Sequence, residues 1–273
     1  MWAKALILSS VVGAVSVLGE GPMCGCEHRY GVLMEFYDST NGPSWGNPVS
    51  SVQGWNTSIS CNQSWTGVFC TRGDVYMIVL DGLRVNGPFP SILANLTALL
   101  ELKMPNNQIT GTLPPSFNLL KQLYLLDVQY NAISGTLPSE WSSFDSLTTL
   151  WAFSNSITGT LPPAWSAMKN LQILDLSFNS LIGILPPEWS QMSSLHVLTL
   201  SKNALSGTLP ATWSILVKLE TLQLQNNGFS GTLPSDWCSL SSMRALDLSL
   251  NSFEGRFVVK CTLRGQICHF WKL

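Results

Sequence analysis

The chain has 273 residues, of which only 11% are charged, and its formal net charge is −2. This balance argues against nucleic acid as a partner, because binding to a phosphate backbone requires a strongly basic surface. A low charge combined with many hydroxyl and amide side chains is instead typical of an extracellular protein.

Residues 1–19 are predicted to be a cleaved secretory signal. Lys4 supplies a positively charged start, and residues 5–18 form an apolar run that suits a signal and is too short to span a bilayer. The alternative is a buried N-terminal helix. No later segment reaches membrane-spanning length, so we expect no transmembrane segment after signal cleavage.

Residues 20–74 are predicted to form an N-terminal cap. Leu33, Phe36 and Tyr37 share one face of an expected helix, which residues 40–43 end with the sequence Thr-Asn-Gly-Pro. Three tryptophans follow: Trp45, Trp55 and Trp65. A cap would cover the first repeat's apolar edge, which would otherwise promote aggregation.

Residues 75–260 are organised by a period of 24 residues. The most regular position is an asparagine, which recurs as Asn107, Asn131, Asn155, Asn179, Asn203, Asn227 and Asn251. The unit reads LxxLxLxxNxLxGxLPxxWxxLxx. Eight such units predict an α/β solenoid, a leucine-rich-repeat right-handed superhelix with a concave parallel sheet. One short strand per repeat is expected at 78–80, 102–104 and every 24 residues onward.

Each recurring residue of the unit has a physical reason. The leucines of neighbouring units share one core, because a single strand cannot bury its own apolar face. The Asn amide can pair with backbone groups that the turn would leave unsatisfied. Gly permits the bend that follows. The Trp rings are predicted to stack from repeat to repeat on the outer side of the core, rather than to form a ligand site.

The xGxLP sequence after the Asn resembles plant-type extracellular leucine-rich repeats, and the cap resembles the cap of that class. The GTLPxxW variant is similar to the surface-antigen and proteophosphoglycan family of trypanosomatid parasites. The resemblance covers about residues 30–255 and implies an adhesive or ligand-binding ectodomain, secreted or on a cell surface. Members of that family often carry a stalk rich in Thr and Pro and a lipid-anchor signal, and the tail 261–273 shows neither pattern. A secreted variant, a truncated copy and an incomplete gene model remain open.

Seven cysteines in a secreted chain favour disulfides. Cys61 and Cys70 are predicted to close a loop that carries Trp65. Cys238 and Cys261 occupy nearly equivalent positions of stacked units about 5 Å apart, within bridging distance, although two buried free thiols are the alternative. The partners of three cysteines stay open: Cys24, Cys26 and Cys268. The spacing of Cys and His does not favour a zinc site.

Three Asn-x-Ser/Thr sites are predicted to be glycosylated: Asn56, Asn62 and Asn95. Two of them lie in the cap and one lies on the convex side. None lies on the concave strands, which would leave that face free for a partner.

An aromatic patch flanked by carboxylates is predicted in the middle of the concave face. Residues between the leucines point outward there, because successive side chains of a strand alternate between faces. The predicted ligand-binding residues are Tyr124, Asp127, Tyr130, Trp151, Phe153, Asp175 and Phe178. Exposed aromatic groups at this density usually mark an interface. The alternatives are that Phe153 and Phe178 fold back against the sheet edge, or that the repeat with Ala152 in a leucine position is irregular.

No catalytic constellation, cofactor motif or metal site has support from the spacing of residues. The sequence therefore predicts a non-enzymatic binding module for an extracellular protein or glycan, with no cofactor. Two alternatives remain: a structural coat antigen without a specific ligand, and a protein inhibitor of a secreted hydrolase.

Overall fold

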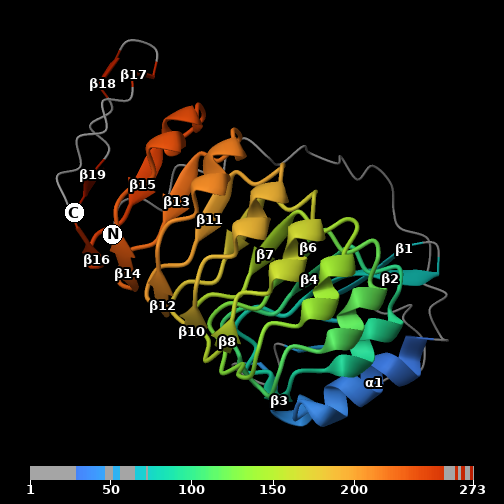
Figure 1. The fold of residues 1–273 in the computed structure, drawn as a ribbon. Coiled ribbons are helices and arrows are strands. Elements are labelled where there is room, and N and C mark those ends of the chain that lie inside the picture. Colours follow the sequence, from blue (N-terminus) through green and yellow to red (C-terminus); the bar gives the residue numbers. More distant parts are fainter. Residues whose placement is uncertain are drawn as a thin grey trace.

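A computed structural model of the chain describes residues 29–46, 52–55, 65–71 and 73–254. Near the C-terminus it describes three short strands by their backbone: β17 (Thr262–Leu263), β18 (Gln266–Ile267) and β19 (Trp271–Lys272). The elements follow one another side by side in a curved row that begins at helix α1 (Figure 1). The expected signal segment, 1–19, lies outside the described residues.

The main sheet confirms the solenoid. Its strands are β1 (Val68–Thr71), β2 (Asp74–Val79), β4 (Glu101–Lys103), β6 (Leu125–Asp127), β7 (Thr149–Trp151), β9 (Ile173–Asp175), β11 (Val197–Thr199), β13 (Thr221–Gln223), β15 (Ala245–Asp247) and β19, in that order. All pairs from β2 to β15 are parallel, and each residue pairs with the one 24 positions later, as Leu126 does with Leu150. The register therefore follows the sequence period.

Two details of the strands differ from the expectation. The strand expected at 102–104 is β4, at Glu101–Lys103, because the chain turns at Asn106, whose φ is 56°. The strand expected at 78–80 starts earlier, since β2 also pairs with the antiparallel strand β1. That pairing covers the first edge of the sheet, so the cap includes a strand that the sequence did not indicate.

A second strand follows the turn in most repeats, whereas one strand per repeat was expected. These strands are β3 (Asn86–Pro88), β5 (Gln108–Thr110), β8 (Thr158–Thr160), β10 (Ser180–Gly183), β12 (Ala204–Gly207), β14 (Gly228–Gly231) and β16 (Ser252–Phe253). The last five form a second sheet, and β3 pairs separately with β5. In β10, exposed Ser180 and Ile182 flank buried Leu181, which is the alternation of a half-buried strand. The sequence signal was therefore present but very short.

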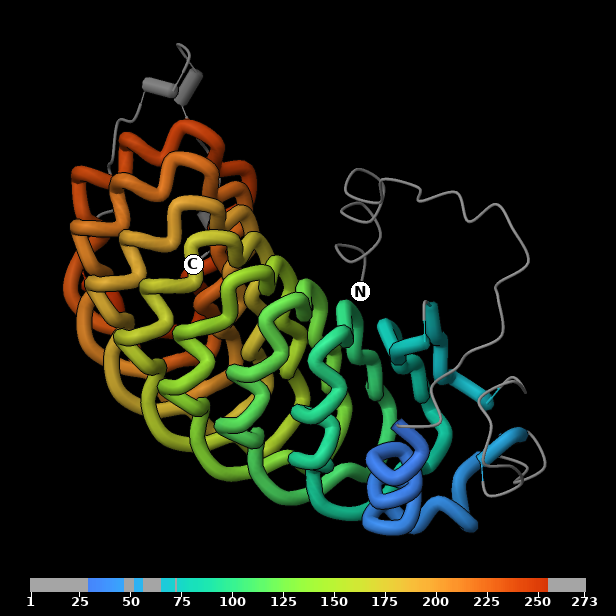
Figure 2. The backbone as a smooth tube through the Cα atoms, turned by 90° about the vertical axis from the view of Figure 1, so that its right-hand side faces the viewer, coloured from blue at the N-terminus to red at the C-terminus, as the bar shows by residue number. Residues whose placement is uncertain are grey.

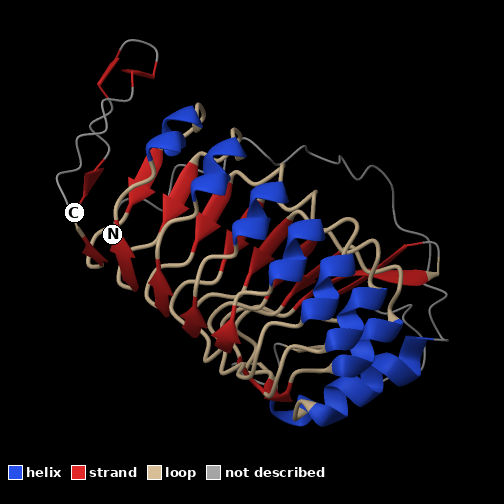
Figure 3. Ribbon diagram, viewed as in Figure 1, coloured by secondary structure: helices blue, strands red, loops and turns tan. Residues whose placement is uncertain are grey.

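Short 3-10 helices cover the opposite side of each repeat (Figure 3). They are η4 (Ser91–Asn95), η5 (Pro115–Leu119), η6 (Ser139–Ser143), η7 (Pro163–Ala167), η8 (Pro187–Gln191), η9 (Ala211–Ile215) and η10 (Ser235–Ser239), and each follows a proline at its N-cap. Neighbouring Trp rings on this side are 6.1–6.5 Å apart, whereas paired strands lie about 4.8 Å apart. The helical side is therefore longer, so the main sheet lies on the inner, concave side of the curve, which is visible in the backbone trace (Figure 2).

The outer part of the core is a stack of five indoles: Trp141, Trp165, Trp189, Trp213 and Trp237. Successive rings are nearly parallel, with interplanar angles of 3–8°. Each indole N–H donates to a proline carbonyl of the preceding repeat; that of Trp189 donates to Pro162 O at 2.9 Å. Because the buried N–H has a partner, the large ring can be buried without leaving a polar group unsatisfied. The structural role expected of these tryptophans is confirmed.

The recurring asparagines, here called the Asn ladder, join successive repeats through their side-chain amides. Asn179 Nδ2 donates to Ala152 O of the preceding repeat at 3.0 Å and to Leu176 O of its own repeat at 3.1 Å. Its Oδ1 accepts from the Ile157 N–H at 2.9 Å. The equivalent bridges are made by Asn107, Asn131, Asn155, Asn203, Asn227 and Asn251. One side chain thus satisfies backbone groups of two turns.

The N-terminal cap contains the expected helix, α1 (Tyr30–Ser39), which buries Leu33, Phe36 and Tyr37. Tyr37 stacks on Trp55 with centroids 5.6 Å apart, and Trp45 lies 5.0 Å from Trp55. These rings belong to the same apolar core as the leucines of the first repeats. The cap therefore extends the solenoid core past its first strand.

Asn179→Ala tests the Asn ladder. We expect a loss of roughly 1–3 kcal/mol or more in the free energy of unfolding, because buried donors and acceptors of the backbone lose their partner. Urea unfolding of the full chain measures this. Asn170→Ala is the matched control, since Asn170 is exposed and donates to one carbonyl, Asp145 O. Equal losses for the two variants would contradict a structural role of the ladder.

Candidate functional site

The concave face presents a column of side chains from the last residue of each strand. Strand pairing places Trp151 in register between Asp127 on one side and Asp175 on the other. The neighbouring positions hold Lys103 and Thr199. The alternation of strand side chains thus brings together the three predicted residues of this column, as expected.

A second column lies at the turn, one residue before the Asn ladder. Its residues all have a positive φ of 52–58°: Asn106, Tyr130, Ser154, Phe178, Lys202, Asn226 and Leu250. Asn adopts this left-handed conformation readily, whereas bulky residues are rare in it. Tyr130 and Phe178 nevertheless occupy the column, with 47% and 46% of their surface exposed. Their rings are therefore exposed at positions where the backbone conformation does not favour a bulky side chain.

Two predicted residues are buried rather than exposed. Phe153 is only 8% exposed, and its ring meets that of Tyr130 edge to face at 5.1 Å. Asp127 is 5% exposed. The alternative in which Phe153 folds back is thus the correct one for this residue, because its ring supports Tyr130 from within. Phe178 does not fold back.

Tyr124 lies apart from the other aromatic residues. It precedes β6, whereas Tyr130 follows the same strand, so the two rings occupy opposite ends of it. Tyr124 is 37% exposed, and its hydroxyl donates to the carboxylate of Glu101. We call Tyr130, Trp151, Phe153 and Phe178, with Asp127 and Asp175, the concave patch. Tyr124 is left at its edge.

The carboxylates of the patch also have a local structural role. Asp175 Oδ1 accepts from the Ser177 N–H at 3.0 Å and from Ser177 Oγ at 2.6 Å. Asp127 accepts from the Gln129 N–H at 3.2 Å and from Gln129 Nε2 at 3.0 Å. These bonds fix the direction of each carboxylate. Burial raises the pKa of the Asp127 carboxyl above its usual value, although the Gln129 hydrogen bonds oppose this shift.

Lys202 is a residue of the site that the sequence analysis missed. Its Nζ lies over the Phe178 ring, 4.3 Å from the centroid. The signal was available in the sequence, because Lys202 is 24 residues after Phe178 and therefore occupies the same position of the next repeat. Two further charges of the face were also missed, Lys103 and Glu101, which form an ion pair.

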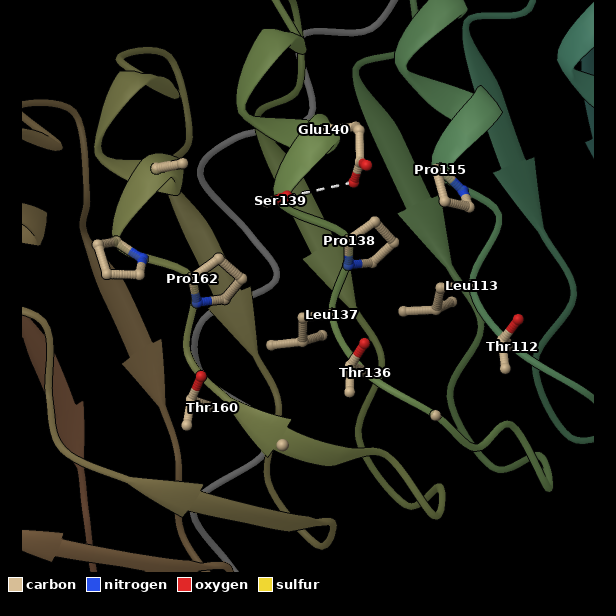
Figure 4. A pocket seen from close by; sticks show the side chains of 14 residues that line it. Thr112, Leu113, Pro115, Thr136, Leu137, Pro138, Ser139, Glu140, Thr160 and Pro162 are labelled. Atoms are coloured by element: carbon tan, nitrogen blue, oxygen red, sulfur yellow. Dashed lines mark hydrogen bonds between the residues drawn. The ribbon is translucent and has the colours of Figure 1, made fainter.

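A different hollow lies between the helices and the second sheet, over β8 and η6 (Figure 4). This groove of about 830 Å³ crosses three repeats. Its lining is mostly uncharged, with a row of threonines at Thr112, Thr136 and Thr160 and a single carboxylate, Glu140. It offers few groups for specific recognition compared with the concave patch.

Several other predicted sites are only partly described. Asn95 is exposed at the end of η4, as a glycosylation site requires, whereas Asn56 and Asn62 lie outside the described residues. Cys70 and Cys238 are half-buried, and their expected partners, Cys61 and Cys261, also lie outside the described residues. Both bridges and all three glycosylation sites stay predictions.

Among the described residues, no three His, Cys, Asp or Glu side chains converge as metal ligands would. None of the helices in the described part of the chain has the length and apolar character needed to cross a membrane.

Phe178→Asn tests whether the exposed Phe178 ring contributes to the stability of the core. We expect the free energy of unfolding to change by less than about 1 kcal/mol, because relief at the left-handed position offsets the loss of an exposed cation–π contact. The same substitution at buried Phe153 is the control and should cost about 3 kcal/mol or more. Thermal and urea unfolding measure both variants. A large loss for Phe178→Asn would show that this ring belongs to the core.

Asp127→Asn tests the buried carboxyl. A raised pKa means that the folded state favours the protonated form, so the stability that Asp127 contributes falls as the pH rises through its folded pKa. We expect the Asn variant to gain stability over the native chain at pH 7, and the gain to vanish at low pH, where Asp127 is protonated in both states. Urea unfolding across this range measures it, with exposed Asp145→Asn as the control for charge. A gain that stays constant with pH would contradict the expectation.

The leucine-rich repeat family profile matches residues 169–229. The LRR receptor-like serine/threonine-protein kinase GHR1 of Arabidopsis thaliana is 41% identical over 63 residues, which is 22% of this chain and 6% of that protein. The match falls on the repeats and not on the kinase region. It therefore carries information about the repeats alone.

Two solved structures show the same architecture over most of the chain. The complex of PEPR1 with AtPEP1 has a TM-score of 0.76 and 26% identity, covering 83% of this chain and 32% of that one. The Arabidopsis receptor kinase HAESA ectodomain, in complex with an N-terminally extended IDA peptide hormone, has a TM-score of 0.74 and 26% identity, covering 88% and 40%. This chain spans less than half of each. Its repeats are homologous to the extracellular leucine-rich repeats of plant receptor kinases.

Proposed function

We propose that the chain is an extracellular leucine-rich-repeat module that binds a protein ligand, most simply an extended peptide segment, through the concave patch. The observation that carries this proposal is the pair Tyr130 and Phe178, about half exposed at left-handed positions. Aromatic rings that stay about half exposed and gather on one face are typical of interfaces. Aromatic side chains are also frequent anchors of binding energy.

The similar solved structures support the general part of the proposal, which is an extracellular module that binds a ligand. The HAESA ectodomain was solved with a peptide hormone, and the PEPR1 structure is a complex with AtPEP1. A parallel sheet with outward side chains every second residue offers a row of contacts along its curved face. The plant relatives described above do not bear on the trypanosomatid resemblance, which stays a prediction.

The position of the exposed sequon also agrees with an extracellular binding module. Asn95 ends η4 on the convex side, so a glycan there would leave the concave patch free. A coat antigen without a specific ligand gives no reason for bulky rings at the left-handed positions. We therefore favour a binding module over that alternative, and place the chain outside the cell.

Trp151→Ala is the direct test of the site. The ligand is first captured from extracellular material of the source organism with the full chain, then purified and titrated by calorimetry. We expect Trp151→Ala to weaken binding by about 2 kcal/mol or more, which is roughly 30-fold in Kd. The matched control is Gln223→Ala, in the same column three repeats later, which should have little effect. A ligand that binds the Trp151→Ala and Tyr130→Asn variants as tightly as the native chain would move the site to the cap or the groove.

A further inference from the structure

We infer that the concave patch recognises a basic side chain, a lysine or arginine of the bound segment, held over the Tyr130 ring beside Trp151. This inference rests on the proposed function, because it names the chemistry of the ligand at the same site. It is carried by the charge of the face and by the position of Lys202.

The concave face is acidic within the described residues. Its outward positions hold the carboxylates Asp81, Glu101, Asp175, Glu220 and Asp247, and the cations Lys103, Lys202 and Arg244; Asp127, in the same column as Asp175, is buried. Two of these cations already have carboxylate partners on the face: Lys103 with Glu101, and Arg244 with Glu220 at 3.1 Å. A cationic ligand is therefore attracted to the face, and an acidic one is repelled.

Lys202 shows how a cation can contact an aromatic ring in the turn column of the concave face. Lys202 Nζ lies 4.3 Å from the centroid of Phe178, which belongs to the preceding repeat. The ring face carries the negative part of its quadrupole, so it attracts an ammonium or guanidinium group. Lys202 is therefore an internal example of the contact that we assign to the ligand.

Tyr130 occupies the equivalent turn position of an earlier repeat. Two repeats separate it from Phe178, and its backbone has nearly the same φ, 52° against 54°. The residue equivalent to Lys202 in the repeat after Tyr130 is Ser154. Its side chain is short and uncharged, so it places no cation over the Tyr130 ring. The Tyr130 ring is 47% exposed. A basic side chain of a ligand can take there the place that Lys202 takes on Phe178.

The surroundings of Tyr130 strengthen the attraction. Asp127 is three residues before Tyr130, and Asp175 lies on the far side of Trp151 in the strand register. Charges that are partly removed from water are screened less than exposed ones. Phe153 holds the Tyr130 ring from one side at 5.1 Å. The ring is thus held from one side and stays half exposed on the other, on a face whose column of carboxylates favours a cation.

The experiment compares lysine with acetyl-lysine. Immobilised synthetic peptides of mixed sequence, each made with lysine and with acetyl-lysine at the same place, are probed with the purified full chain. Acetylation keeps the aliphatic part of the lysine side chain, adds a small acetyl group to its nitrogen and removes the charge. For the peptides that bind, we expect acetylation to weaken binding by about tenfold or more.

Ser154→Lys adds an internal competitor. Lys202 shows that a lysine is tolerated at this left-handed position, so the variant should fold and place its own ammonium over Tyr130. We expect it to weaken the binding of lysine peptides by about tenfold. Ser156→Lys is the matched control, since it adds the same charge at an exposed position two residues later. Circular dichroism of both variants verifies that the fold is unchanged.

The outcomes distinguish the two proposals. Peptides that depend on Trp151 but bind equally well with lysine and acetyl-lysine would overturn the cationic ligand and leave the concave site intact. Equal losses for Ser154→Lys and Ser156→Lys would also overturn it, because general charge repulsion would then explain the effect. Binding that is indifferent to Trp151 and Tyr130 would overturn the concave site itself.

Discussion

The structure depends on side-chain carboxamides that form hydrogen bonds with two successive repeats. Each turn after a main-sheet strand leaves carbonyl and N–H groups inside the solenoid, where water cannot reach them. Asn179 supplies both a donor and an acceptor to these groups, and it spans from its own turn to the preceding one. Its geometry is satisfied only when neighbouring repeats are in the same register. The Asn ladder therefore fixes the stacking on which the core and the curved face rest.

The same constraint shapes the candidate site. To bring the ladder Asn inward, the residue before it must turn the backbone into a left-handed conformation, and its side chain is then directed to the rim. Tyr130 and Phe178 are exposed because the turn leaves them there, not because the core rejects them. The site is thus built on turns that the Asn ladder holds by hydrogen bonds, which favours aromatic side chains that are in place before a ligand arrives.

Much of the fold could be predicted from the sequence, because it repeats. The leucines, the ladder asparagines and the stacked tryptophans each recur at one spacing, so errors at single positions do not obscure the period. The second sheet was missed since its strands are only two to four residues long. The antiparallel strand β1 was missed because it occurs once, outside the period.

The site was harder to predict than the fold. Strand alternation correctly put Trp151 between Asp127 and Asp175, since register alone decides it. The burial of Phe153 depends on its contact with Tyr130, and the position of Lys202 depends on a side-chain rotamer. Neither follows from a binary pattern of apolar and polar residues, because both are contacts between neighbouring repeats.

The hydrogen bonds between repeats have a consequence for how such a protein can change over generations. The Trp189 indole and the Asn179 amide both reach a partner 27 residues earlier, and the sheet register advances by 24. Duplication or loss of one whole unit therefore lets every bond re-form with an equivalent partner, whereas insertion of a single residue within a unit breaks several at once. This architecture therefore tolerates the gain or loss of whole repeats. Each such change lengthens or shortens the recognition surface by about 4.8 Å.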